Sequence, residues 1–237
     1  MARRPTASRS RPGRVILGAL IVGLAVVTVG PSAAQVETVP AFAGPPGGPK
    51  VAAVGDSILG QLESEGPTHP TSTRAFTLSL IDQGWRASVK ARNAWRAARV
   101  RVLAGQAVDL GAEVVIVSAG SGDVRWVRES ADPGTARQAV RRSIRRFLRD
   151  VEDQCVIWPT MPVVGGAGER RTALAVNDEL TTADAESTAV RSPDWAGLAP
   201  QHPGWFIADG VHLSRPGEAA FQHTLLTAAR RCVAGLD

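Results

Sequence analysis

The sequence has no tyrosine, has lysine only at Lys50 and Lys90, and has no acidic residue before Glu37. The first two absences exclude no fold and no function. The third matters, because the same N-terminal stretch holds Arg3, Arg4, Arg9, Arg11 and Arg14. These arginines account for the whole formal net charge of +5, so the remaining chain is close to neutral. Since nucleic-acid binding requires a basic footprint, we expect no nucleic-acid partner.

Charge is also missing from the apolar run of residues 15–29 that follows these arginines. Ser32-Ala33-Ala34 then offers the small residues of a cleavage site, so residues 1–34 have the pattern of a secretory signal peptide. An uncleaved membrane anchor is the alternative, although the run is shorter than the roughly 20 residues of a membrane span. We therefore predict a secreted or extracytoplasmic protein that contacts a membrane only if this segment is retained.

The next stretch, residues 35–49, is rich in proline, glycine and alanine, and we predict that it is a linker with nothing to bury. A second candidate cleavage site lies within it, after Ala43. Residues 50–237 follow without a visible internal repeat, and this length suits one domain with a buried core.

Cysteine is scarce, with Cys155 and Cys232 alone in the sequence. In an exported protein this even count predicts a disulfide, which would join a strand to the last helix. Two buried free thiols are the alternative.

Apolar and alternating segments predict the strands. The run at 113–120 suits a central strand buried on both faces, and the weaker alternation at 86–92 suits an edge. Strands are expected at 51–55, 86–92, 113–120, 155–162 and 205–209, with helices at 73–83, 94–105, 135–151, 171–186 and 216–235. The arginine-rich face of the third of these helices is interpreted as solvated surface. This alternation predicts an α/β fold with helices on both faces of a parallel sheet, and a site at the carboxyl ends of the strands.

Three side chains suggest the chemistry of that site. Ser57 follows the first strand through Gly55, where the N-terminus of a helix would offer free N–H groups to an oxyanion. His212 can exchange a proton near neutral pH, and Asp209 lies close enough in sequence to hold its ring. Taken singly, the Ser57 motif is better explained by a strand-to-helix turn with a helix cap, and the Asp209–His212 pair also fits a helix-entry loop. No fitting set of metal ligands is visible, and no cofactor is expected. His69, His202 and His223 are given little weight.

Together, Gly55-Asp56-Ser57 and Asp209-Gly210-Val211-His212 resemble the first and last motifs of the SGNH hydrolases, also called GDSL-type lipases and esterases. The resemblance spans residues 50–237. It implies a flavodoxin-like three-layer α/β/α sandwich with about five parallel strands. It also implies Ser57 as nucleophile, His212 as base and Asp209 as the partner of the base. The Gly-x-Ser-x-Gly elbow of the α/β-hydrolases is absent around Ser57, which favours this family.

Two departures concern the oxyanion hole. The family's Gly-x-Asn-Asp motif is Gly120-Ser121-Gly122-Asp123 here, so Gly122 has no side chain to donate. The glycine of the second motif is also missing, which leaves the backbone N–H of Ser57 and one further backbone donor, Ala94 or Gly122. Loss of one such donor costs about 10²–10³ in rate. Asn93 or Ser121 is a hypothetical substitute donor, and Gly122→Asn is expected to raise the rate.

The sequence therefore predicts an exported serine esterase that hydrolyses or transfers an acyl group, such as acetyl, on a cell-envelope carbohydrate or lipid. The alternative is an inactive relative that binds envelope glycan or a partner protein. Its stacking surfaces would come from tryptophans, namely Trp95, Trp126, Trp158, Trp195 and Trp205. A membrane-tethered acyltransferase partner is a third hypothesis. Residues 66–73, 163–170 and 192–204 are predicted to shape the pocket.

Overall fold

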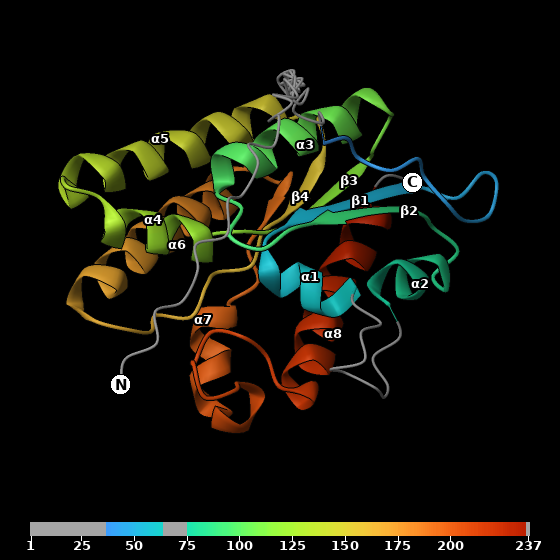
Figure 1. Ribbon diagram of the computed structural model, residues 1–237. Helices are drawn as coiled ribbons and strands as arrows, with labels where there is room; N and C mark the ends of the chain where they lie inside the picture. The colour runs from blue at the N-terminus through green and yellow to red at the C-terminus, as the bar shows by residue number, and fades with distance from the viewer. Residues whose placement is uncertain (1–36, 64–74, 236–237) are drawn as a thin grey trace, which may run out of the picture. The chain divides into compact units, whose positions relative to one another are not determined.

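The computed structural model describes residues 37–63 and 75–235. Its centre is a parallel five-stranded sheet in the order β2-β1-β3-β4-β5 (Figure 1). The strands are β1 (Lys50–Gly55), β2 (Arg86–Ala91), β3 (Val114–Ser118), β4 (Cys155–Ile157) and β5 (Val190–Arg191). The predicted α/β class and parallel sheet are confirmed, as are the edge position of β2 and the central position of β3.

Helices cover both faces of this sheet, as the layers in Figure 1 show. One face packs against α3 (Ala97–Asp109), α5 (Pro133–Asp150) and α6 (Ala167–Glu186), with α4 (Ser121–Glu129) beside them. The other face packs against α1 (Ser57–Glu63), α2 (Phe76–Ile81), α7 (Trp195–Leu198) and α8 (Arg215–Val233). Strand residues alternate between the two cores: Ala52 and Val54 face the first, and Val51 and Ala53 face the second. Burial on both faces explains why β1 and β3 are almost wholly apolar. The result is the expected three-layer sandwich.

The cysteines form the expected disulfide, so the alternative of free thiols is wrong. Cys155 begins β4, and Cys232 lies in the last turn of α8. Their Cα atoms are 5.8 Å apart, within the usual range for a disulfide. The bond therefore fixes the end of the C-terminal helix to the sheet.

The prediction of a last strand at 205–209 is wrong, because the final strand of the sheet is β5, which lies earlier in the chain. Trp205 ends a short 3-10 helix, and Phe206 forms one isolated antiparallel bridge with Leu213. The side chains of Trp205 and Phe206 pack onto the core of the second face instead of entering the sheet. A short apolar run does not distinguish these two outcomes.

The described part of the expected linker, residues 37–49, packs against the domain, contrary to the expectation that it buries nothing. Val39 is buried, and Ala43 forms an antiparallel bridge with Ala87 of β2. The hydroxyl of Ser88 donates to the carbonyl of Pro40. This segment therefore shields the edge strand, which would otherwise present unpaired backbone groups. The predicted signal peptide lies outside the described residues. Among the helices that are described, none is long and apolar enough to cross a membrane.

Candidate active site

Ser57 stands at the carboxyl edge of the sheet, where β1 passes into α1. Gly55 allows this turn, because a Cβ there would lie 2.5 Å from the carbonyl oxygen of Ser118 on β3. The N–H of Asp56 donates to that same carbonyl, at 2.7 Å. Ser57 is the first residue of α1, so its backbone N–H is one of the helix's unpaired donors, as the sequence predicted.

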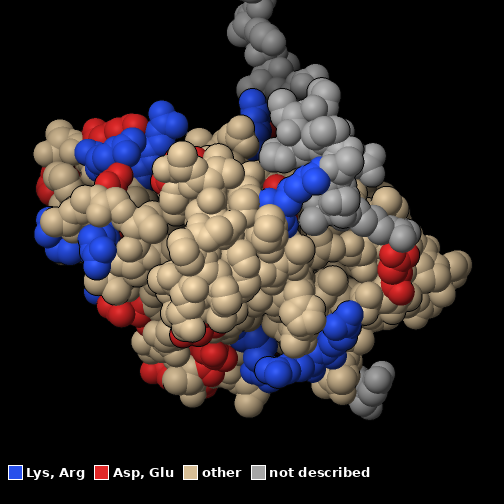
Figure 2. All heavy atoms as spheres, turned by 90° about the horizontal axis from the view of Figure 1, so that it is seen from below, with Lys and Arg blue, Asp and Glu red and all other residues tan. Residues whose placement is uncertain are grey.

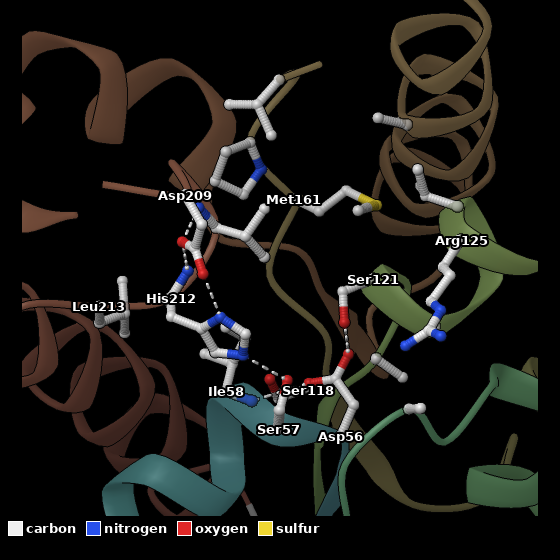
Figure 3. Close-up of a pocket in the computed structure, with 18 of the residues that line it drawn as sticks. Asp56, Ser57, Ile58, Ser118, Ser121, Arg125, Met161, Asp209, His212 and Leu213 are labelled. Atoms are coloured by element: carbon white, nitrogen blue, oxygen red, sulfur yellow. Dashed lines mark hydrogen bonds and ion pairs between the residues drawn. The ribbon is translucent and has the colours of Figure 1, made fainter. Parts of the chain in front are cut away.

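The three predicted catalytic side chains meet in one hydrogen-bonded chain (Figure 3). Ser57 Oγ lies 3.0 Å from His212 Nε2, and His212 Nδ1 lies 2.6 Å from Asp209 Oδ2. An ionised Asp209 can only accept, so Nδ1 carries the proton and Nε2 accepts from the serine hydroxyl. The serine and the histidine come from opposite ends of the domain. Their meeting produces the arrangement of nucleophile, base and base-orienter.

Asp209 holds the backbone of its own loop, residues 209–212, as well as the imidazole of His212. Its second oxygen, Oδ1, accepts from the N–H groups of Val211 and His212, both at 2.9 Å. Partial burial raises the pKa of Asp209, but the hydrogen bonds from the His212 ring and these N–H groups lower it by more, so the pKa lies below its usual value. The carboxylate therefore remains charged at neutral pH. The side chains of Asp209 and His212 are 45% and 36% exposed, so their ion-pair energy is screened and their main effect is orientation.

An aromatic stack supports this loop. Trp205 lies parallel to Trp195 with ring centroids 5.2 Å apart, and His202 stacks over Trp205 at 4.0 Å. The Trp205 indole is thus stacked against two neighbouring rings, and Trp158 is fully buried. These contacts disfavour the hypothesis that these tryptophans offer stacking faces to a glycan.

Asp56 is a buried carboxylic acid directly beside Ser57 in the sequence. Its Oδ1 accepts from the N–H of Ile58, and its Oδ2 accepts from the hydroxyl of Ser121 at 2.6 Å. Burial raises the pKa of Asp56, and these hydrogen bonds offset only part of the rise. Ser121 has one hydroxyl proton, which is directed to Asp56. Both Ser121 and Asn93 line the cavity, and the hypothesis that either donates to an oxyanion stays a prediction.

Gly122 is buried where α4 packs on the segment before α3. A Cβ at Gly122 would lie 2.5 Å from the carbonyl oxygen of Trp95 and 2.8 Å from that of Ala94. Ala94 itself has a φ of 62°, a left-handed conformation that a non-glycine residue rarely adopts. No side chain fits at Gly122 without moving this backbone. This packing argues against the expectation that Gly122→Asn raises the rate, which stays a prediction.

Asp123 is a structural residue that the sequence did not reveal. It is buried, and its Oδ2 accepts from the N–H of Ala97 at 2.8 Å, which caps the start of α3. Burial raises its pKa to about 6, although the hydrogen bond from Ala97 and the nearby Arg96 charge oppose the rise. Asp123 thereby joins α4 to the segment that carries Ala94.

The triad opens into a cavity of about 540 Å³. Apolar side chains form most of its walls, including Pro159, Met161, Pro162 and Trp195, and Arg125 and Arg128 line it from α4. The side-chain amide of Asn177 fixes one wall by bonding both the N–H and the carbonyl of Met161. The predicted loops 163–170 and 192–204 contribute Val164, Glu169 and Trp195. The third predicted loop, 66–73, lies outside the described residues, as does His69.

The face below the sheet in the view of Figure 1 is poor in charge. Residues 195–208 contain no Lys, Arg, Asp or Glu, and Figure 2 shows a broad uncharged area with charges at its margins. Leu198 and Ile207 are exposed in this stretch. Among the described residues, no group of three or more His, Cys, Asp or Glu side chains could hold a metal ion.

Comparison with known structures finds proteins of similar fold. An acetyl-xylooligosaccharide esterase from Geobacillus, solved as a point variant, is 17% identical, with a TM-score of 0.57 over 76% of this chain and 94% of that one. A GDSL-like lipase from Bacteroides thetaiotaomicron is 14% identical, with a TM-score of 0.55 over 79% and 89%. The C-terminal catalytic domain of peptidoglycan O-acetyltransferase A from Streptococcus pneumoniae is 15% identical, with a TM-score of 0.54 over 78% and 94%.

The chain has the SGNH hydrolase fold. At these identities the similarity concerns the fold, and the expected resemblance is confirmed at that level. No family model and no curated protein matches the sequence. These proteins therefore share a fold with this chain. A shared fold does not establish a function, which depends on the residues of the site.

Proposed function

We propose that this protein is an exported serine esterase that hydrolyses or transfers an acyl group, such as acetyl, on a cell-envelope carbohydrate or lipid. The observation that carries the proposal is the hydrogen-bonded chain from Ser57 through His212 to Asp209 at the mouth of the cavity. The relatives in fold include an esterase, a lipase and an O-acetyltransferase, which supports acyl-ester chemistry. The disulfide and the signal-peptide pattern support export.

In the proposed reaction, Ser57 Oγ attacks the acyl carbonyl carbon while His212 Nε2 takes the hydroxyl proton. The carbonyl π electrons move to oxygen, and the backbone N–H groups of Ser57 and Ala94 stabilise that oxyanion. Collapse expels the alkoxide, which takes the proton from His212. Water, or a second alcohol in a transfer reaction, then repeats these steps on the acyl-serine and restores the enzyme.

The rate should be modest, because Gly122 supplies no side-chain donor and the packing around it leaves no space for one. One missing donor corresponds to about 10²–10³ in kcat, so the proposed enzyme remains active but slow. The cavity is also mostly apolar, which suits an acyl group and excludes water from part of the site.

A fluorophosphonate tests the proposal directly. The purified protein should gain the mass of one phosphonyl group, and the Ser57→Ala variant should gain none. Short acyl esters should then be hydrolysed by the parent and not by the variant. A folded parent that remains unlabelled would contradict the proposal and support the alternative, a relative that binds a glycan or a partner protein.

A further inference from the structure

A second recess, of about 250 Å³, lies between α3, α4 and α5. Helix α4 lines the catalytic cavity with Val124, Arg125 and Arg128, but it lines this recess with Asp123 and Trp126. The two hollows therefore use different faces of the same helix. Basic side chains dominate the second one, and we call the following set the arginine recess: Arg96, Arg101, Arg142 and Arg146.

Helix α5 carries two rows of arginines that differ in pairing. Arg141 and Arg145 both bind the carboxylate of Glu179 on α6, whose side chain is only 6% exposed. Arg142 and Arg146, one position further along, instead line the recess and are exposed. Within the part of the chain that the structure describes, neither of these two has an ion pair. The second row therefore presents two uncompensated charges, about 6 Å apart along the helix axis.

The other two arginines are held in place by neighbours. The guanidinium of Arg96 lies over the ring of Trp126, 4.4 Å from its centroid, and Arg101 pairs with Asp150. Asp123 is the acid inside the recess, and its Oδ2 is already bonded to the N–H of Ala97. Stacking on an aromatic ring leaves the guanidinium N–H groups of Arg96 free to donate. The recess thus combines two arginines that neighbouring side chains hold in place with the unpaired Arg142 and Arg146.

Cations that converge on a concave surface repel one another unless an anion lies between them. Guanidinium groups from several directions match a phosphate, which presents oxygens on several sides, better than a carboxylate, which presents two on one edge. A concave recess also suits a single phosphate group of a soluble ligand better than a flat membrane surface. We propose that the arginine recess binds a phosphate group of a small, soluble polyanion. This site is independent of the esterase proposal.

The net charge of the chain gives no indication of the arginine recess. The chain outside the N-terminal segment is nearly neutral, because its Lys and Arg residues are matched in number by its Asp and Glu residues. A binding site differs from a solvated helix face here only because Arg142 and Arg146 on α5 lie against Trp126 and α3. Our sequence-based interpretation of this helix face as solvated surface is therefore replaced by this proposal.

The test is calorimetric titration of the Ser57→Ala protein with inorganic tripolyphosphate at low and physiological salt. We expect saturable 1:1 binding that weakens with salt. The Arg142→Gln/Arg146→Gln variant should bind at least about tenfold more weakly, because each charge-assisted hydrogen bond corresponds to roughly a factor of ten. The matched control is Arg149→Gln/Arg171→Gln, which removes the same charge from α5 and α6 outside the recess and should bind like the parent. Thermal melts confirm that all variants fold.

Three results would overturn the proposal. One is absence of saturable tripolyphosphate binding. Another is an equal loss of binding in the control variant, or loss only in Arg125→Gln/Arg128→Gln, which would place the anion elsewhere. A third is binding to phosphatidylglycerol–phosphatidylcholine vesicles without binding to tripolyphosphate, which would indicate a membrane surface. None of these readouts depends on turnover, so failure of the esterase proposal would be seen separately.

Discussion

The carbonyl oxygen of Trp95 lies 2.5 Å from the point where a Cβ on Gly122 would be placed. This close approach holds the start of α4 against the segment that carries Ala94. An asparagine, as in the SGNH motif, therefore cannot be placed here without moving the backbone. The proposed oxyanion hole and the packing of α4 are one structural unit.

We expect Gly122→Ala to destabilise the fold by about 1–3 kcal/mol through overpacking, and to lower kcat because Ala94 must shift. Gly122→Asn should be worse. The matched control is Gly105→Ala in α3, where nothing lies within 4 Å of the added Cβ. That change should stabilise the protein by up to about 1 kcal/mol through helix propensity. Denaturant unfolding and ester turnover measure both effects. A Gly122→Asn enzyme that is faster and equally stable would disprove the packing argument.

Asp209→Asn should reduce kcat by about 10⁴ while leaving the fold intact. The asparagine oxygen can still accept from the N–H groups of Val211 and His212, so the loop keeps its shape. Its amide would face Nδ1 of His212, however, and favour the tautomer whose Nε2 carries a proton and cannot accept one from Ser57. Asp132→Asn makes the same change at the N-cap of α5 and should leave kcat unchanged. If Asp209→Asn kept near-parental turnover, Asp209 would not be the orienting residue.

Asp123 predicts an unusual pH dependence of stability. Its pKa is raised from 3.8 to about 6 in the folded protein, so the folded state binds this proton more tightly than the unfolded chain does. The contribution of Asp123 to the free energy of unfolding is therefore fully present below pH 4 and is lost as the pH rises to about 6. The loss amounts to about 2–3 kcal/mol. Asp123→Asn keeps an acceptor for Ala97 and should be the more stable protein at pH 7.

The measurement is the free energy of unfolding of parent and Asp123→Asn between pH 3.5 and 7. Because other carboxylates titrate in the same range, the difference between the two proteins is the useful quantity. It should move in favour of the variant as the pH rises, and level off above about pH 6. A difference that is independent of pH would mean that the pKa of Asp123 is the same in the folded and unfolded states.

Reduction of the disulfide between Cys155 and Cys232 should lower the free energy of unfolding by about 2–4 kcal/mol. The bond closes a sequence separation of 77 residues, so its loss frees a long loop in the unfolded chain. A Cys155→Ala/Cys232→Ala variant should be less stable than the oxidised parent and unaffected by reductant. Equal melting temperatures of the oxidised and reduced parent would show that α8 is held by packing alone.

The sequence predicted the parts whose signals are local. The strand β3 is a continuous apolar run, and Ser57 and His212 are parts of short motifs at element ends. The strand predicted at 205–209 is wrong because Trp205 and Phe206 pack onto the core of the second face, a tertiary contact that periodicity does not encode. Helix α4 was not predicted, since Gly120-Ser121-Gly122 has low helix propensity and only packing compensates for it. The role of Asp123 also depends on a residue far along the chain, Ala97.

The parallel stack of Trp195 and Trp205 has a practical consequence. A protein without tyrosine owes its near-ultraviolet signal chiefly to tryptophan, and this indole pair adjoins the loop that carries Asp209 and His212. The difference in circular dichroism and fluorescence between the parent and Trp195→Phe isolates the signal of that pair. The protein therefore contains its own optical reporter of whether the loop with Asp209 and His212 is in place, without any added label.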